Sequence, residues 1–170
     1  MKQNGTDMTD NATTIRYATE QDVPFIKACI HELAVYERSA EKDESTEDML
    51  RENIFVKGFA KVLIAEYNGE KVGYALWFNN FSTWLARPGI YLEDLYVRPQ
   101  FRHKGVGKAL LKRLAEITVE NGWGRLEWSC LKWNTPSLDF YESLGARQMD
   151  EWIQLRMDGE RLKRFGTKDE

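Results

Sequence analysis

Residues 90–108 of this 170-residue chain read IYLEDLYVRPQFRHKGVGK, and they determine its architecture. The segment Ile90–Val97 is mostly apolar and β-forming, and Pro99 ends it because proline cannot donate to a strand ladder. A helix over 105–121 follows, with apolar residues at helical spacing. The next strand is expected over Arg125–Leu131, so the three elements form a β-α-β unit whose strands must run parallel.

The rest of the chain supplies antiparallel strands and further helices. Asn68-Gly69 separates two apolar, β-rich segments and predicts a tight hairpin, because both central turn residues need positive φ. Thr19 and Asp22 are spaced as in a capping box, which predicts a helix start. The predicted order is β-α-α-β-β-β-α-β-α-β. Outside the central unit we expect strands over 13–17, 60–67, 71–78 and Glu151–Met157, and helices that begin near Thr19, Ser45 and Asn134.

These elements predict an α/β fold with a mixed, mostly antiparallel central sheet, one parallel β-α-β unit and helices on both faces. The length fits one domain, since a second core would be too small. We expect this domain over 13–158, between an N-terminal tail over 1–12 and a charged C-terminal tail over 159–170.

Composition narrows the class of protein. Hydrophobic residues make up 42% of the chain and aromatic residues 12%, which is enough for a globular core. No apolar run approaches the ~20 residues of a membrane helix, and residues 1–12 lack the apolar stretch of a signal peptide. Cys29 and Cys130 follow no disulfide or metal pattern, so we expect a cytoplasmic protein with no metal site. The net charge of −3 disfavours nucleic-acid binding, so neither nucleic acid nor membrane is an expected partner.

Basic residues are concentrated in one segment. Residues 98–113 contain six of the 24 Lys and Arg residues and none of the 27 Asp and Glu residues. This segment of an otherwise acidic chain indicates a specific anionic ligand, although a solvated helix face is the simpler alternative. Gly105 and Gly107 favour the ligand, because they permit close approach to a helix N-terminus whose unpaired amides bind phosphate.

Three phosphate-loop patterns compete for this segment. A Walker A loop fails because Arg102 and Ala109 stand where its first glycine and its hydroxyl residue belong. A dinucleotide fingerprint lacks its third glycine, which Leu110 replaces. The pattern Arg-x-x-Gly-x-Gly is met in full by Arg102, Gly105 and Gly107.

This third pattern, placed between a strand and a helix, resembles the acetyl-CoA pyrophosphate loop of the GNAT acetyltransferases. Three other segments are similar to the spermidine/spermine and thialysine N-acetyltransferases of that family. They are Glu32–Glu37 (ELAVYE), Tyr91–Val97 (YLEDLYV) and Trp133–Tyr141 (WNTPSLDFY). The resemblance spans about residues 14–157 and implies a GNAT fold, acetyl-CoA as cosubstrate, a small cationic amine as substrate and a homodimer.

The resemblance also implies roles for individual residues. The implied cofactor-binding residues are Leu95, Tyr96, Val97, Arg102, His103, Lys104, Gly105, Val106, Gly107, Lys108, Asn134, Ser137 and Tyr141. The implied substrate-binding residues are Tyr36, Glu37, Glu93, Asp94, Glu127 and Trp128. The pattern includes one more acidic residue near the last strand, for which Asp150 and Glu151 are both candidates.

Elementary chemistry agrees with catalytic roles for Glu93 and Tyr141. An alkyl amine of pKa ~10.4 is neutral in about one molecule in 2,500 at pH 7, which costs about 4–5 kcal/mol before attack. Glu93 is placed to accept a proton from the amine, directly or through water, and Tyr141 to protonate the leaving thiolate. A strand amide such as that of Leu95 would hold the oxyanion. The simpler alternatives are that Glu93 or Asp94 meets solvent, since neighbours on a strand face opposite ways, and that Tyr141 is a core aromatic.

The sequence therefore predicts an N-acetyltransferase that transfers acetyl from acetyl-CoA to a primary amine within a ternary complex. Polyamines, diamines and lysine analogues are the expected acceptors. One alternative is a GNAT enzyme for a protein amine or an aminoglycoside. The other is a non-catalytic acyl-CoA-binding module, against which the presence of Glu93 and Tyr141 argues.

Overall fold

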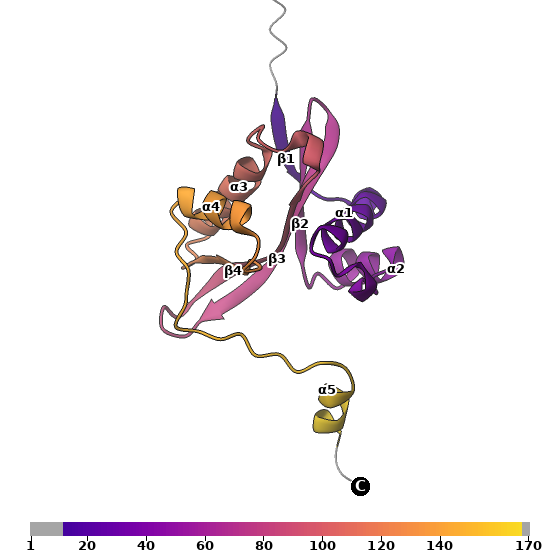
Figure 1. Cartoon of the computed structure of the whole chain (residues 1–170), viewed down its shortest axis with the longest axis vertical. Coiled ribbons are helices and arrows are strands. Elements are labelled where there is room, and N and C mark those ends of the chain that lie inside the picture. The colour runs from indigo at the N-terminus through magenta and orange to yellow at the C-terminus, as the bar shows by residue number, and fades with distance from the viewer. Residues whose placement is uncertain (1–11, 168–170) are drawn as a thin grey trace, which may run out of the picture. The chain divides into compact units, whose positions relative to one another are not determined.

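The computed structural model describes residues 12–167. It forms two compact units, the first ending at Ser129 and the second beginning at Cys130, and each is described by itself. The first unit contains a five-stranded sheet with the strand order β1-β2-β3-β4-β5. Figure 1 labels strands β1 to β4 of this sheet. Its strands are β1 (Thr13–Tyr17), β2 (Lys61–Tyr67), β3 (Glu70–Ser82), β4 (Arg87–Val97) and β5 (Leu126–Trp128).

The sheet is mixed, as the sequence predicts. Neighbouring strands from β1 to β4 pair antiparallel, and β4 pairs with β5 in parallel. Helix α3 (Val106–Glu120) connects these two parallel strands, so the predicted β-α-β unit is confirmed. Strand β5 is shorter than the predicted Arg125–Leu131, because it accompanies β4 over only three residue pairs.

The hairpin between β2 and β3 is also confirmed. Asn68 and Gly69 have φ angles of 52° and 81°, the left-handed conformation that a two-residue hairpin turn needs. Residues Tyr67 and Glu70 face each other at the ends of the two strands. Strand β3 then runs to Ser82, beyond the predicted end at Phe78.

Helices cover both faces of the sheet. On one face lie α1 (Val23–Tyr36) and α2 (Glu47–Leu50), which continues as a π-helix over Arg51–Val56, and α3 lies on the other (Figure 1). The core on the α1 face is a cluster of Ile26, Cys29, Ile54, Val62, Ile64, Tyr74 and Tyr96. The buried side of α3 consists of Val106, Leu110, Leu111, Leu114, Ile117 and Thr118.

Asp22 fixes the entry to α1. Its buried carboxylate accepts hydrogen bonds from Arg16 at 2.7 and 3.0 Å and from the Thr19 amide at 2.8 Å. Lys71 of β3 lies 2.6 Å from the same carboxylate. These donors hold the pKa of Asp22 well below its usual range, Arg16 contributing most.

The second unit contains helix α4 (Thr135–Ser143) and helix α5 (Gly159–Gly166), the latter within the expected charged tail. The predicted strand over Glu151–Met157 is wrong: this segment has no strand partner among the described residues. Trp152, Ile153 and Leu155 are 65%, 86% and 89% exposed. An alternating apolar pattern requires a neighbouring strand to become a ladder, and the described residues supply none.

Candidate active site

Strand β5 ends before β4 does and leaves part of β4 open. Their pairing covers Ile90, Tyr91 and Leu92 of β4 and then stops. From Glu93 to Val97 the β5 side of β4 therefore has no strand beside it in the first unit. Such an edge presents backbone groups that an extended ligand can pair with, as in strand addition.

Backbone hydrogen bonds show which residues face this open edge. The Arg98 amide donates to the Val72 carbonyl at 2.9 Å, so Val97 and Gly73 form a non-hydrogen-bonded pair. The backbone groups of Val97, and by alternation those of Leu95, consequently point away from β3. Those of Tyr96 point toward β3, so two of the three predicted pantetheine-binding residues present backbone groups at the edge.

A β-bulge lies where β4 leaves β5. Leu76 of β3 faces Asp94 and the next residue, Trp77, faces Leu92, which leaves Glu93 as the extra residue. The expectation that Glu93 and Asp94 point to opposite faces assumed regular alternation, which a bulge interrupts. Asp94 lies on the same face as Tyr74, the face that α1 covers.

Three carboxylates gather around this bulge. Burial raises the pKa of Asp94 to about 6, and the nearby charges of Glu93 and Glu37 raise it as well. Burial also raises the pKa of Glu37, the residue that follows α1. Asp94 and Glu37 are half-buried and Glu93 is exposed, so the cluster is open to solvent on the side of Glu93.

The end of α1 is fixed relative to β4. Arg98, just after β4, makes a two-pronged ion pair with Glu32 of α1, at 2.9 and 3.2 Å. Arg38 adopts the left-handed φ of 58°, so α1 ends at Tyr36 and Glu37 is its C-cap residue. The ion pair and this helix end place Glu37 near Asp94.

The loop before α3 has the properties of a phosphate site. Gly105 has φ 80° and precedes the helix, and a Cβ placed on it would meet no atom within 4 Å. The first helical hydrogen bond runs from the Ala109 amide to the Gly105 carbonyl, so the amides of residues 106–108 have no partner within the helix. His103, in the same loop, also has a positive φ of 60°. Unpaired amides at a helix start can bind phosphate, and the pyrophosphate role of this loop stays a prediction.

Two cations of the loop lie against aromatic rings. The guanidinium carbon of Arg102 is 4.9 Å from the ring centre of Tyr36 and 5.8 Å from that of Tyr96. The ammonium of Lys104 lies 5.0 Å from the ring centre of Tyr67. Arg102 therefore connects the predicted phosphate loop with the predicted substrate residue Tyr36.

Strand β5 contributes the carboxylate of Glu127, whose negative charge is already paired with an arginine. Glu127 lies 2.8 Å from the Arg125 Nε and accepts a hydrogen bond from the Asn80 amide at 2.6 Å. Trp128, the neighbouring predicted substrate residue, is half-buried at the end of the pairing with β4. Glu127 therefore differs from Asp94, which has no cationic partner among the described residues.

The predicted residues of the second unit share helix α4. Asn134 precedes the helix and is buried, and its carbonyl accepts from the Ser137 and Leu138 amides at 3.1 Å. Tyr141 is seven residues further on, two helical turns, so it lies on the same side of α4 as Asn134. The approach of Tyr141 to a thioester remains a prediction, as do the roles of Asp150 and Glu151.

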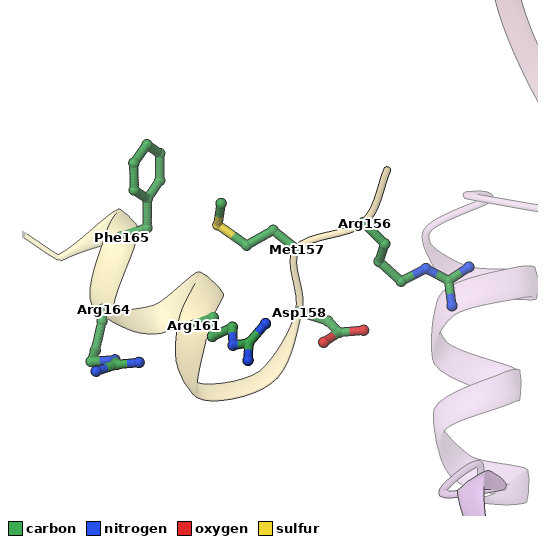
Figure 2. Close-up of a pocket in the computed structure, with 6 residues that line it drawn as sticks. All are labelled: Arg156, Met157, Asp158, Arg161, Arg164 and Phe165. Atoms are coloured by element: carbon green, nitrogen blue, oxygen red, sulfur yellow. The ribbon is translucent and has the colours of Figure 1, made fainter. Parts of the chain in front are cut away.

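The C-terminal segment contains an open hollow of about 460 Å³. Figure 2 shows its six lining side chains on α5 and the segment before it, namely Arg156, Met157, Asp158, Arg161, Arg164 and Phe165. All six residues are exposed, and none of them belongs to the predicted site. Across residues 12–167 no group of His, Cys, Asp and Glu is arranged to hold a metal ion, and no helix is long and apolar enough to cross a membrane.

Comparisons with known proteins identify the family of this chain. The profile of the Acetyltransferase (GNAT) family matches residues 26–146. A thialysine N-epsilon-acetyltransferase of Sus scrofa is 36% identical over 166 residues, covering 91% of this chain and 97% of that protein. An L-ornithine N5-acetyltransferase of Arabidopsis thaliana is 31% identical over 195 residues, covering 88% and 86%.

Solved structures show the same fold. An integron cassette protein from the mobile metagenome of V. cholerae has a TM-score of 0.78 at 25% identity, covering 92% of this chain and 98% of that one. An aminoglycoside acetyltransferase from an uncultured soil sample has a TM-score of 0.74 at 20% identity, a likeness of fold alone, covering 89% and 99%. The profile match spans most of the chain and the relatives align along nearly all of it, so the chain belongs to the GNAT family of acetyltransferases.

Proposed function

We propose that the protein transfers an acetyl group from acetyl-CoA to a primary amine of a small cationic molecule, such as a diamine, a polyamine or a lysine analogue. The observation that carries the proposal is the position of Asp94. This carboxylate lies half-buried beside an open strand edge, with Glu93 and Glu37 near it and no cationic partner among residues 12–167. A cationic acceptor would supply the missing positive charge.

The relatives support this class of acceptor. Their names give thialysine and L-ornithine, small amino acids with a primary amine on the side chain, as the molecules that those proteins acetylate. The substrate of this chain is proposed by analogy with them and with the acidic cluster around Asp94. The aminoglycoside enzyme, at 20% identity, does not bear on the substrate.

The proposed reaction is a direct transfer. The amine nitrogen attacks the thioester carbonyl, a C–N bond forms and the C–S bond breaks. Glu93, exposed at the bulge, accepts the proton that the amine loses, directly or through water. Tyr141 donates a proton to the departing thiolate. The outward amide of Leu95 holds the oxyanion of the tetrahedral intermediate.

The binding roles follow the open edge and the helix start. The pantetheine arm would pair with Leu95 and Val97, and the pyrophosphate would lie against the amides of residues 106–108. Asp94 and Glu37 would bind an ammonium group of the acceptor. Tyr36 would line the acceptor site through its contact with Arg102.

A homodimer in the cytoplasm completes the proposal. The homodimer is carried over from the family resemblance, and the exposed apolar side chains of Trp152, Ile153 and Leu155 are consistent with a covered surface in the assembly. Light scattering coupled to size exclusion tests it directly. A mass of one chain at micromolar concentration would contradict the dimer.

The activity is tested with the purified full chain, acetyl-CoA and a panel of acceptors. The panel contains thialysine, lysine, ornithine, putrescine, spermidine, an aminoglycoside and a peptide with a free N-terminus. We expect release of CoA and a product heavier by one acetyl group with at least one small diamine or lysine analogue. Acetylation of only the peptide or the aminoglycoside would favour the alternative acceptors, and binding of acetyl-CoA without any turnover would favour the non-catalytic module.

Tyr141→Phe tests the acid role. We expect kcat to fall at least about tenfold while the Kd of acetyl-CoA, measured by calorimetry, stays within about twofold. The exposed residue Tyr17 provides the control Tyr17→Phe, which should leave both quantities unchanged. Equal turnover in Tyr141→Phe and wild type would remove Tyr141 from the acid role.

A further inference from the structure

A fully buried tyrosine contacts the carboxylate at the centre of the acidic cluster. The hydroxyl of Tyr74, on β3, donates a hydrogen bond to Oδ2 of Asp94, on β4, at 2.7 Å. The two residues lie diagonally across the antiparallel pair, because Tyr74 faces Tyr96 and Asp94 is two residues before Tyr96. Strand pairing therefore holds the hydroxyl and the carboxylate together.

The titratable groups that act on this pair are acidic. Glu93, on β4, and Glu37, after α1, act on Asp94, and the Cys29 thiol on α1 lies near Tyr74. Burial raises the pKa of the Tyr74 hydroxyl well above its ordinary value, so this group stays a proton donor. The hydroxyl is the hydrogen-bond donor that Asp94 has within residues 12–167, and the structure pairs no Lys or Arg with it.

This arrangement gives the two oxygens of Asp94 different tasks. Oδ2 is held by Tyr74, whereas Oδ1 has no hydrogen-bond partner among the described residues. We infer that Tyr74 is a positioning residue of the acceptor site, which anchors Asp94 through Oδ2 and leaves Oδ1 for an N–H group of the cationic acceptor. The inference rests on the proposed function and adds to it a residue that touches neither substrate nor cofactor.

The sign of the pH effect follows from the hydrogen bond. A donor to the carboxylate stabilises its charged form, so the Tyr74 contact lowers the pKa of Asp94 against the effect of burial. Asp94 must be ionised to bind a cation, so activity should fall as the pH drops through its pKa of about 6. Removing the hydroxyl raises this pKa, and the acid limb of the activity profile moves to higher pH.

The test compares Tyr74→Phe with Tyr17→Phe, which removes the hydroxyl of an exposed tyrosine at the end of β1. The profile of kcat/KM for the best acceptor is measured between pH 5 and pH 9. We expect the acid limb of Tyr74→Phe to shift upward by about one pH unit or more, with activity largely recovered at pH 9, and that of Tyr17→Phe to stay in place. If the wild-type protein is active and the acid limb of kcat/KM for Tyr74→Phe lies at the wild-type pH, the inference is overturned.

A second readout does not depend on turnover. Carbon-13 NMR of labelled aspartate carboxyls follows the titration of Asp94, whose signal is assigned as the one missing from Asp94→Asn. We expect its midpoint to rise in Tyr74→Phe without any substrate present. An inactive wild type with this shift would contradict the proposed function and support the contact, whereas an unmoved midpoint would overturn the positioning role.

A double variant separates positioning from general damage to the fold. In an Asp94→Asn background the added Tyr74→Phe change should leave the pH profile unaltered, because Tyr74 acts through the carboxylate. A further displacement of the profile in the double variant would show that Tyr74 acts by another route and would overturn the inference.

Discussion

The Nε of Arg102 donates a hydrogen bond to the carbonyl oxygen of Val97, at 3.0 Å. This bond ties the start of the loop before α3 to the last residue of β4. The same guanidinium lies against the ring of Tyr36. Arg102, itself in the predicted phosphate loop, thus contacts the strand edge at Val97 and the predicted acceptor-site residue Tyr36.

Arg102→Lys should weaken cosubstrate binding although it keeps the charge. A lysine has no Nε–H to donate to the Val97 carbonyl and no planar group to stack on Tyr36. The loop therefore loses the two contacts that hold Arg102 in place. We expect the KM for acetyl-CoA to rise about tenfold, measured at saturating acceptor. Arg113→Lys, which changes an arginine paired with Glu116 and Glu120 on α3, is the control and should leave KM unchanged. Equal KM values for Arg102→Lys and wild type would contradict the role of these two contacts in acetyl-CoA binding.

Gly105→Ala should impair acetyl-CoA binding more than stability. Alanine at φ 80° is strained by about 1 kcal/mol, and its Cβ would extend into open space at the helix start, where a ligand would approach the backbone. Gly122, at the other end of α3, has φ 65° and equally open surroundings, so Gly122→Ala has the same strain away from the loop. We expect a similar loss of unfolding free energy in both variants but a Kd for acetyl-CoA raised about tenfold in Gly105→Ala alone. Similar Kd values in the two variants would contradict a phosphate site at this loop.

Asp94→Asn should stabilise the fold and impair the enzyme. The folded pKa of about 6 lies above the unfolded value of about 3.9, so the charge lowers the unfolding free energy above pH 6 and has little effect below pH 4. We expect a gain of about 1–2 kcal/mol in unfolding free energy at pH 7.5, which vanishes near pH 4. We also expect kcat/KM for the cationic acceptor to fall about a hundredfold. Asp48→Asn, at an exposed residue of α2, should change neither quantity, and a destabilised Asp94→Asn at pH 7.5 would refute this account.

Asp22→Asn should have the opposite effect on stability. The pKa of Asp22 is depressed in the folded state, so its stabilising contribution is complete above pH 4 and is lost as the pH falls below that value. We expect the variant to lose about 2–3 kcal/mol of unfolding free energy at pH 7, because Arg16 and Lys71 keep partial access to water. Urea unfolding at pH 7 and pH 2.5 measures this, and the difference between the two proteins should be smaller at the lower pH. A constant difference between them across this range would argue against the ion pairs as its source.

Local signals in the sequence predicted most of the first unit. Asn68-Gly69 specifies its turn through the φ angles that the dipeptide favours, and the glycines around α3 mark where that helix begins and ends. The segment Glu151–Met157 shows the limit of such signals. Its alternating apolar residues are typical of a strand, but they do not show which segment would pair with it. Among the described residues no strand pairs with this segment.

The candidate site was predictable by residue type more than by geometry. Glu93 and Asp94 are recognisable in the sequence because they are charged residues in an apolar strand. No residue type in that strand predicts the bulge at Glu93. Tyr74 has the appearance of any core residue of β3, and only its hydroxyl contact with Asp94 reveals a role. The stacking of Arg102 on Tyr36 joins residues distant in sequence, which no spacing rule connects.

Because β5 pairs with only three residues of β4, the unpaired remainder of β4 has a consequence for solubility as well as for binding. An exposed strand edge invites other sheets to add to it, and such additions lead to aggregation. Here the free edge is short, because it begins where β5 ends at Trp128 and runs only from Glu93 to Val97 of β4. So short an edge offers few backbone groups to another sheet, which limits edge-to-edge association, while an extended ligand of a few bonds' length could still pair with it.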